Sequence, residues 1–199
     1  MLFRSNIKKF SSCSIIRPRP VVGKGRLGIF EILFDWVIDN KKIPIIGSGN
    51  NIFQFAHIDD LVDVSIETAD RNISGIFNIG TDTYSTIKED LNKSFEIIGS
   101  KSRVLPIPKF ICVPSLFLLD KINLSPLSSW HYLSYSWEFH YALDETFKVL
   151  NWRPKYSNTD MIVEAFNWYE ENKEKIGQIG SSHRSKVKQQ FLKLLKFFL

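Results

Sequence analysis

Residues 23–28 of this chain read GKGRLG and match G-x-G-x-x-G, the glycine spacing with which a dinucleotide-binding loop approaches a pyrophosphate. The loop follows an apolar stretch at 14–22, but Pro18 and Pro20 interrupt that stretch, and proline donates no hydrogen bond to a central strand. The next apolar stretch, 43–46, is not followed by the acidic residue that would hold a ribose hydroxyl. We therefore interpret the motif as a flexible glycine loop before a helix.

Two further spacings could support proton transfer. Tyr84 with Lys88, and Tyr169 with Lys173, place a lysine one helical turn from a tyrosine, where its charge would lower the pKa of the phenol. Neither pair follows a strand that offers a serine or threonine partner, and in a lysine-rich chain with six tyrosines such spacings arise by chance. We interpret both pairs as coincidental.

His57, Asp59 and Asp60 lie together in the sequence and could form a metal site or an acid/base group. The alternation Phe53, Phe55, His57 puts the imidazole on the same strand face as two aromatic rings. The acidic pair has the position of a helix N-cap. Structural roles are therefore favoured over catalysis for all three residues.

The other histidines and the cysteines do not indicate a metal site. His131 and His140 have no ligand spacing to each other. Cys13 and Cys112 are the only cysteines, too few for a disulfide framework or a cysteine zinc site. A reduced, cytoplasmic setting is the default. We expect no bound metal and assign no catalytic residue to this chain.

Charge is distributed unevenly along the 199 residues, whose formal net charge is +5. Residues 1–28 and 181–199 carry basic and no acidic side chains, whereas residues 29–180 are acidic overall. Because no basic stripe runs through the folded part, we expect no nucleic-acid partner. The longest nearly apolar stretch, 111–119, is shorter than the roughly 20 residues that a membrane-spanning helix needs.

The pattern of apolar residues predicts alternating strands and helices. Strands are expected at 14–22, 43–46, 53–58, 75–79, 103–107 and 139–143. Helices are expected at 28–40, 59–70, 86–98, 110–122, 144–150 and 158–175. Such alternation predicts an α/β domain with parallel strands. The helix at 110–122 is apolar almost all round, so we expect it to be buried or to line a pocket.

The two ends are expected to differ from the folded part. Residues 1–13 are predicted to be an unstructured start, and residues 176–184, with two glycines and a polar run, to be a linker. Residues 185–199 are predicted to form a basic amphipathic helix, because as a helix they gather five apolar side chains on one stripe. Such a helix could dock on this protein or on a partner, make weak contact with a membrane surface, or stay disordered.

Four blocks of sequence resemble, in the same order, the motifs of one enzyme family. These blocks are residues 15–23 (I-x-R-P-x-x-V-x-G), 45–61 (G-x-G…F-x-H-V-x-D), 75–80 (G-x-x-F-N-I-G) and 150–154 (L-G-W-x-P, with Asn151 in place of the glycine). On these blocks, residues 14–175 resemble the C-terminal half of an extended short-chain dehydrogenase/reductase domain of the NAD-dependent epimerase/dehydratase family.

The resemblance implies an incomplete Rossmann-like parallel sheet with a small mixed α/β C-terminal substrate subdomain. The complete family uses NAD or NADP to oxidise a substrate alcohol by hydride transfer, with a tyrosine as base and a lysine that lowers its pKa. The family's glycine-rich cofactor loop and this Tyr/Lys pair lie upstream of the strand at 14–22, and the chain does not contain that segment. We therefore expect no cofactor to bind to this chain alone. By resemblance, Pro20, Val21 and Val22 would lie on the nicotinamide side.

The resemblance also implies where a substrate would bind. The family's asparagine near Pro20 and arginine near Phe53, which tend to face substrate phosphates, are replaced here by proline and phenylalanine. An ordinary diphosphate clamp is therefore not expected. The remaining candidates for substrate binding are Asn50, Asn51, Gln54, His57 and His131.

Two functions remain open at this stage. The first is the substrate-binding part of an NAD(P)-dependent sugar-nucleotide epimerase/dehydratase-like oxidoreductase. Its partners would be a small-molecule substrate of the nucleotide-sugar type and an N-terminal half on another polypeptide, and this chain alone would be inactive. The second is a non-catalytic binding or interaction module derived from the same fold.

Overall fold

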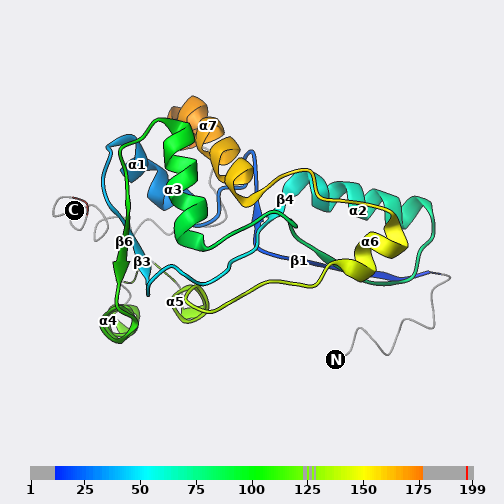
Figure 1. Ribbon diagram of the computed structural model, residues 1–199, viewed down its shortest axis with the longest axis horizontal. Helices are drawn as coiled ribbons and strands as arrows, with labels where there is room; N and C mark the ends of the chain where they lie inside the picture. Colours follow the sequence, from blue (N-terminus) through cyan, green and yellow to red (C-terminus); the bar gives the residue numbers. More distant parts are fainter. Residues whose placement is uncertain (1–11, 123–124, 126, 128, 177–195, 197–199) are drawn as a thin grey trace.

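The computed structural model describes residues 12–122, 125, 127, 129–176 and 196, which form a mixed α/β fold (Figure 1). The strands are β1 (Ser14–Pro18), β2 (Val21–Val22), β3 (Ile43–Ile46), β4 (Ala56–His57), β5 (Gly75–Ile79) and β6 (Val104–Ile107). The helices are α1 (Phe30–Ile38), α2 (Ile58–Asp70), α3 (Ile87–Ile98), α4 (Lys109–Lys121), α5 (Ser129–Ser134), α6 (Asp144–Leu150) and α7 (Asn158–Ile176).

The strands pair in parallel, as the alternation of elements predicts. β1 pairs with β5, β2 with β4 and β3 with β6. In the first pair Ile16 lies opposite Phe77. A tight hairpin cannot join parallel neighbours, so helices lie along the chain between the members of each pair. Within the described residues, β1 meets no second strand on its other edge.

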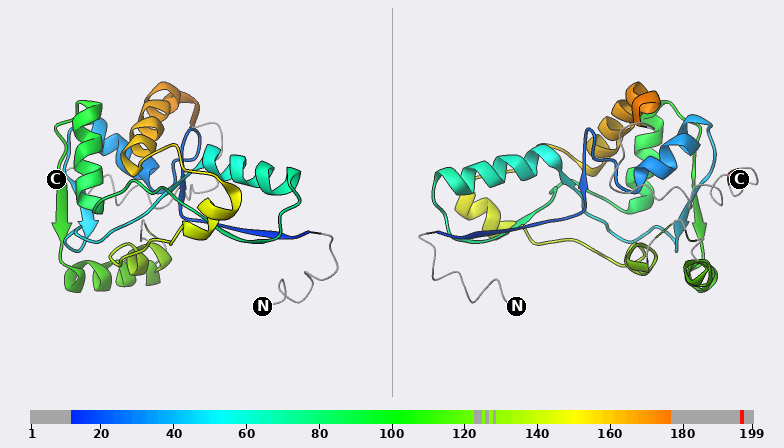
Figure 2. Two further views of the ribbon diagram at one scale, coloured as in Figure 1. Left: turned by 45° about the vertical axis from the view of Figure 1, so that its right-hand side comes forward. Right: turned by 180° about the vertical axis from the view of Figure 1, so that it is seen from behind.

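The elements gather at two ends of an elongated molecule. Strands β1 and β5 lie with α2 and α6 at one end (Figure 1). Helices α1, α3 and α7 lie with β3 and β6 at the other, where α4 and α5 also lie. The two further views in Figure 2 show the same separation between α4 and the far end of β1.

The larger core is aromatic and lies between α1, α7 and the segment before β4. The rings of Phe34 and Phe166 meet edge to face with centroids 5.4 Å apart, and Phe30 meets Phe55 in the same way at 5.4 Å. Such pairs contribute about 0.5–1.5 kcal/mol beyond the burial of their surface. The apolar face of α1 therefore docks on α7 and positions the chain that enters β3.

A smaller core lies under β1 and β5. It contains Ala56, Val64, Phe77 and Leu150. Phe55 belongs to the larger core and the next residue, Ala56, to the smaller one, because successive side chains along a strand point to opposite faces. The segment around β4 therefore joins the two ends of the molecule.

Helix caps confirm one predicted boundary and correct another. Thr86 caps α3 in a capping box with Glu89, and Gly99 ends the helix in the left-handed conformation, as expected for 86–98. The cap of α2 is His57, whose Nδ1 accepts a hydrogen bond from the backbone N–H of Asp59. The prediction that the acidic pair supplies this cap is wrong, because both acids lie inside the first helical turn.

Four predicted strands are shorter in the structure, and one of them, 103–107, lacks only its first residue. The stretch 14–22 divides into β1 and β2, which pair with different partners. The stretch 53–58 keeps only Ala56 and His57 as β4. The stretch 139–143 forms a single bridge, between Phe139 and Phe53. In these last three cases a backbone partner is available for only part of the apolar run.

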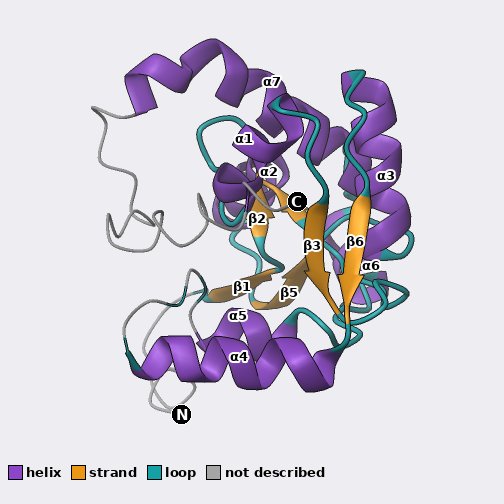
Figure 3. Cartoon of the chain, turned by 90° about the vertical axis from the view of Figure 1, so that its left-hand side faces the viewer, coloured by secondary structure: helices purple, strands orange, loops and turns teal. Residues whose placement is uncertain are grey.

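The sequence predicts that residues 110–122 are buried or line a pocket, and the prediction of burial is wrong for most of α4. Phe110 is 79% exposed, and only Leu116 of this helix is buried. Figure 3 shows the reason: α4 lies along the outside of the molecule, with α5 on its inner side. One face of the helix has a partner in the fold, and the other face has none within the described residues.

The predicted linker and C-terminal helix lie outside the described residues, apart from residues 176 and 196, as does most of the predicted start. The ammonium of Lys196 donates to the carbonyl oxygen of Asp35 at 2.9 Å and lies 2.5 Å from a carboxylate oxygen of Asp39. Among the described helices, none is both long and apolar enough to cross a bilayer. The same residues contain no cluster of three or more His, Cys, Asp or Glu that could hold a metal ion.

Candidate functional site

The loop between β3 and β4 carries the first two predicted substrate residues. Asn50 is exposed at a turn in this loop. Asn51 donates from Nδ2 to the carbonyl oxygens of Tyr135 and Trp137, both at 3.1 Å. Gly49 has a φ of +75°, and a Cβ at this position would lie 2.3 Å from Ile45. The loop therefore folds tightly, with Asn51 holding it to the segment after α5 and Asn50 facing solvent.

Gln54 holds three segments together from inside the protein. Its Nε2 donates to the carbonyl oxygen of Thr81 at 2.6 Å, and its Oε1 accepts from the backbone N–H of Tyr141 at 2.8 Å. The side chain is fully buried, and a Cβ on Gly80 would lie 2.6 Å from its amide carbon. Both polar atoms of Gln54 therefore contact the chain itself, which makes it a positioning residue for the loops around it.

Arg19 belongs to this site and was missed by the sequence analysis. Its guanidinium donates to the carbonyl oxygens of Phe139 at 2.7 Å and Gln54 at 3.3 Å, and its central carbon lies 3.5 Å from the centroid of the Phe139 ring. Arg19 is buried, and burial lowers the pKa of its guanidinium. Within the described residues no carboxylate forms an ion pair with it. Arg17 stands two residues earlier, also before a proline, and is exposed. Nothing in the sequence therefore indicates that Arg19 is buried and bonded to backbone carbonyls.

The predicted nicotinamide-side residues lie in and before β2. The carbonyl oxygen of Pro20 accepts from the backbone N–H of Ala56 at 3.1 Å, and Val21 and Val22 pair with β4. Val22 is buried. This strand is therefore held on one edge by the segment that carries His57.

The glycine loop at 23–28 closes on itself. Gly23 and Arg26 exchange backbone hydrogen bonds of 3.2 and 3.0 Å. A Cβ on Gly23 would lie 2.7 Å from Ile58 and 3.0 Å from Nε2 of His57. The first glycine thus lets β2 approach β4 closely, and two N–H groups that a phosphate-binding loop would present are already bonded.

His57 is buried and points toward α7. Its Nε2 lies 2.6 Å from a carboxylate oxygen of Glu164, and its ring stacks on Tyr156 with centroids 3.7 Å apart. Because Nδ1 accepts from the N–H of Asp59, the proton of the neutral ring is on Nε2 and is donated to Glu164. Lys24 also pairs with Glu164, at 3.3 Å. The imidazole therefore holds the start of α2 against α7.

His131 lies on α5, half-buried among aromatic rings. Its ring centroid is 5.3 Å from those of both Trp130 and Tyr135. The carbonyl of Tyr135 is one of the two that Asn51 holds. The structure thus links the β3–β4 loop to α5, and Gln54 and Arg19 link the same loop to the chain around Phe139. The contacts of His57 run to α7 instead.

The Tyr/Lys spacings have structural explanations. Tyr169 is buried with its ring 5.6 Å from Phe34, and Lys173 forms an ion pair with Asp35 at 3.1 Å. The ring of Tyr84 stacks on His140 at 6.3 Å. The second pair adjoins the β3–β4 loop through its backbone, because the N–H of Lys88 donates to the carbonyl oxygen of Gly49 at 3.1 Å.

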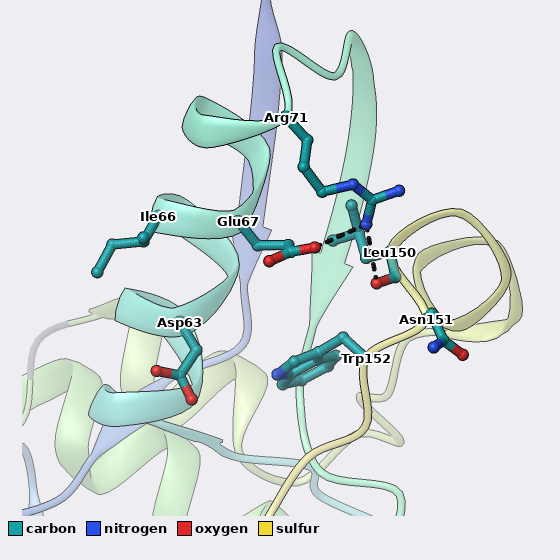
Figure 4. A pocket seen from close by; sticks show the side chains of 7 residues that line it. All are labelled: Asp63, Ile66, Glu67, Arg71, Leu150, Asn151 and Trp152. Atoms are coloured by element: carbon teal, nitrogen blue, oxygen red, sulfur yellow. Dashed lines mark hydrogen bonds and ion pairs between the residues drawn. The ribbon is translucent and has the colours of Figure 1, made fainter.

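A separate surface cavity of about 410 Å³ lies between α2 and the chain that follows α6 (Figure 4). Arg71 crosses it and donates to Glu67 at 2.7 Å and to the carbonyl oxygen of Leu150 at 3.2 Å. Asn151 has a φ of +50°, which explains how it stands where the resemblance expects a glycine. None of the predicted substrate residues lines this cavity.

Comparison with known proteins gives one sequence relative, and this chain matches only part of the length of that protein. No protein-family model matches the chain. The uncharacterised protein y4nG of Sinorhizobium fredii is 37% identical over 187 residues, which are 94% of this chain and 47% of that protein. The chain therefore spans about half the length of the curated relative that it matches.

Solved structures show the fold. The UDP-glucuronic acid 4-epimerase of Bacillus cereus, solved with UDP-glucuronic acid and NAD, matches with a TM-score of 0.60 and 18% identity, over 85% of this chain and 49% of that one. The UDP-N-acetylglucosamine 4-epimerase of B. cereus matches with 0.61 and 14%, over 84% and 52%. The dTDP-glucose 4,6-dehydratase of Bacillus anthracis matches with 0.57 and 16%, over 87% and 50%.

This is half of an epimerase-type Rossmann-like fold. The neighbours are enzymes of the NAD-dependent epimerase/dehydratase family, and the chain covers about half of each. The expected α/β fold with an incomplete Rossmann-like sheet is confirmed. At identities of 14–18% the solved structures show the fold alone. The roles of individual residues stay predictions.

Proposed function

We propose that this chain is the substrate-binding part of an NAD(P)-dependent oxidoreductase that acts on a nucleotide sugar. The observation that carries this proposal is the shared fold with three different nucleotide-sugar enzymes over half of their length. The four sequence blocks that resemble motifs of the epimerase/dehydratase family, and their order along the chain, support the same proposal. By itself the chain would be inactive, because the Tyr/Lys pair and cofactor loop implied by the resemblance lie outside it.

The proposed substrate contacts are Asn50 and His131. Asn50 offers an exposed amide in the β3–β4 loop, and His131 a half-buried imidazole on α5, which Asn51 ties to that loop. Gln54 and Arg19 are positioning residues, since their polar atoms contact backbone carbonyls and N–H groups of the chain. The buried Arg19 also brings a positive charge near this surface, which suits an anionic substrate.

The cofactor would be held mainly by the half that this chain lacks. The turn at 23–28 does not fit a phosphate-binding loop, because Gly23 and Arg26 bond each other. NAD or NADP would supply the hydride acceptor, and Pro20, Val21 and Val22 would border its nicotinamide. The edge of β2 that does not pair with β4 fits this place, since no strand covers it within the described residues.

A chimera tests the proposal. In y4nG, the matching segment is replaced by residues 14–176 of this chain, and binding of NAD, UDP-glucuronic acid, UDP-N-acetylglucosamine and dTDP-glucose is measured by calorimetry. We expect the chimera to bind NAD and at least one nucleotide sugar. Asn50→Ala and His131→Ala should weaken sugar binding about tenfold each, the loss of one or two hydrogen bonds.

Matched controls are Asn172→Ala, whose amide bonds only the carbonyl of Trp168, and His140→Ala, whose exposed ring stacks on Tyr84. Both should leave binding unchanged. A folded chimera that binds NAD but no nucleotide sugar contradicts the proposal. Equal losses in the test and control variants would mean that the substrate site is misplaced.

The second candidate is a non-catalytic binding module. It is favoured by His57 and Gln54, two predicted substrate residues whose polar atoms all bond the chain itself. On this hypothesis the chimera folds, but it binds neither NAD nor a nucleotide sugar.

A further inference from the structure

Helix α4 exposes a continuous apolar stripe. Its members lie at positions i, i+1, i+7, i+8 and i+12, which is one face of a helix. They are Phe110, Ile111, Phe117, Leu118 and, just past the last turn, Ile122, each at least half exposed. On the opposite face Leu116 packs against the protein. We call these five residues the α4 stripe.

Helix α5 enlarges the apolar surface. It packs beside α4 (Figure 3), and it and the residues after it expose Trp130, Leu133 and Trp137. Exposed apolar side chains in such number are a feature of interaction sites. The presence of two tryptophans is informative, since indole rings favour the boundary between lipid chains and water.

Two lysines border this surface. The ammonium of Lys109 donates to the carbonyl oxygen of Ser136 at 2.6 Å and lies 5.3 Å from the ring of Trp137. The ammonium of Lys121 lies 4.8 Å from the ring of Phe117. Each cation thus sits at the border of the apolar residues, where a lysine on a membrane surface would reach a phosphate headgroup.

The charged side chains around the stripe balance, in contrast to the acidic remainder of the domain. From Lys109 to Glu138 they are Lys109, Lys121, Asp120 and Glu138, whereas residues 29–100 carry five basic and twelve acidic side chains. Asp120 accepts a hydrogen bond from the hydroxyl of Tyr132 at 3.3 Å. The two lysines that border the apolar residues are therefore the groups that would contact an anionic surface.

The position of the stripe leaves it accessible to a flat surface. Helix α4 lies on the outside of the molecule, at the end remote from the start of β1 (Figures 1 and 2). A further strand extending the sheet would pair with the unoccupied edge of β1, away from α4. Completion of the sheet at that edge would therefore not cover the α4 stripe.

We propose that the α4 stripe, with α5 beside it, is a surface that binds anionic lipid membranes peripherally. The apolar side chains enter the interfacial region, the tryptophans lie at its border, and Lys109 and Lys121 contact acidic headgroups. Helix α4 lies in the plane of the interface and does not cross the bilayer, consistent with its 13 residues. This proposal is independent of the nucleotide-sugar function.

The test is co-sedimentation of the full chain with vesicles of phosphatidylcholine alone or with phosphatidylglycerol, at low and high salt. We expect binding to the anionic vesicles that weakens with salt, because surface charges are screened over about 8–10 Å. Phe117→Glu/Leu118→Glu should weaken binding more than about tenfold, since burial of one such side chain already contributes more than that factor. Fluorescence from Trp130 and Trp137 should shift to shorter wavelength on binding.

The matched control is Ile66→Glu/Ile97→Glu, which adds the same charge at two residues that are 55% and 57% exposed on α2 and α3. It should bind as the unaltered chain does, and circular dichroism shows whether all variants are folded. Equal binding by both double variants overturns the proposal, as does loss of binding when residues 181–199 alone are removed. A dimer in sedimentation velocity that only Phe117→Glu/Leu118→Glu disrupts, without vesicle binding, would assign the stripe to a second copy and also overturn it.

Discussion

Among the residues that the structure describes, no positively charged side chain is in hydrogen-bond contact with the carboxylate of Asp60. It is buried, and it accepts only the backbone N–H of Lys155, at 3.3 and 3.4 Å from its two oxygens. Burial disfavours the charged form and raises the pKa of Asp60 to about 6, while the N–H of Lys155 and the nearby His57 oppose the shift. Titration of this group therefore affects the stability of the fold.

Ionisation of Asp60 should by itself lower the stability of the fold as the pH rises from about 4 to about 7. The folded protein then still holds a proton that the unfolded chain, with a pKa near 3.8, has released, so the free energy of unfolding falls across this window and is level above it. Asp60→Asn removes the titration. In urea denaturation, the difference in free energy of unfolding between the two proteins should change by about 2 kcal/mol between pH 4 and 7. A constant difference would show that Asp60 does not titrate in this range.

Arg19 is the second buried charge with a specific role. Removing it leaves the carbonyl oxygen of Gln54 without its donor, leaves that of Phe139 with only the backbone N–H of Gln54 at 3.2 Å, and removes a cation from three aromatic rings. We expect Arg19→Ala to lower the free energy of unfolding by about 2–4 kcal/mol. Urea denaturation measures this, with the exposed Arg17→Ala as control, expected to cost less than about 0.5 kcal/mol. Equal effects at the two positions would contradict the role given to Arg19.

At the scale of elements, α3 depends on its ends. The Thr86 hydroxyl accepts from the N–H of Glu89, and the Glu89 carboxylate accepts from the N–H of Thr86. That carboxylate therefore has a lowered pKa, caused first by the Thr86 hydroxyl and then by its N–H. This helix packs on α7, so fraying at its N-terminus would also loosen the β3–β4 loop, where Ile87 donates to the carbonyl of Asn51.

Thr86→Ala should lower the free energy of unfolding by about 1 kcal/mol, the usual cost of losing an N-cap. The control is Thr83→Ala, because the Thr83 hydroxyl bonds only the neighbouring Asp82 side chain at an exposed position. Amide exchange in the first turn of α3 should speed up in the first variant alone. The same loss in both variants would mean that the capping box does not stabilise the helix.

For the whole molecule, the prediction concerns the cofactor. The full chain should show no saturable binding of NADH at micromolar concentrations, because its glycine loop is a closed turn in which Gly23 and Arg26 bond each other instead of presenting their N–H groups to a pyrophosphate. Nicotinamide fluorescence measures this. Saturable binding that is lost on Gly25→Val would identify residues 23–28 as a cofactor loop after all.

The sequence by itself determined the elements whose signals are local. The bounds of β3, β5 and α6 and the extent of α3 follow from residues within one or two turns of each other. Capping, turn formation and apolar periodicity act over this range, so they can be read without knowing the tertiary partners. The alternation of predicted strands and helices, and the order of the four sequence blocks, also predicted the fold class.

The tertiary structure decided which side chains are buried and what they contact. His57 meets Glu164, which is 107 residues away, and Arg19 meets the carbonyl of Phe139, 120 residues away. The division of the strand at 14–22 also depended on distant partners, because β1 and β2 pair with different strands. The outward face of α4 was missed for the same physical reason: an apolar helix is buried only where another element covers it, and composition does not specify which element that is.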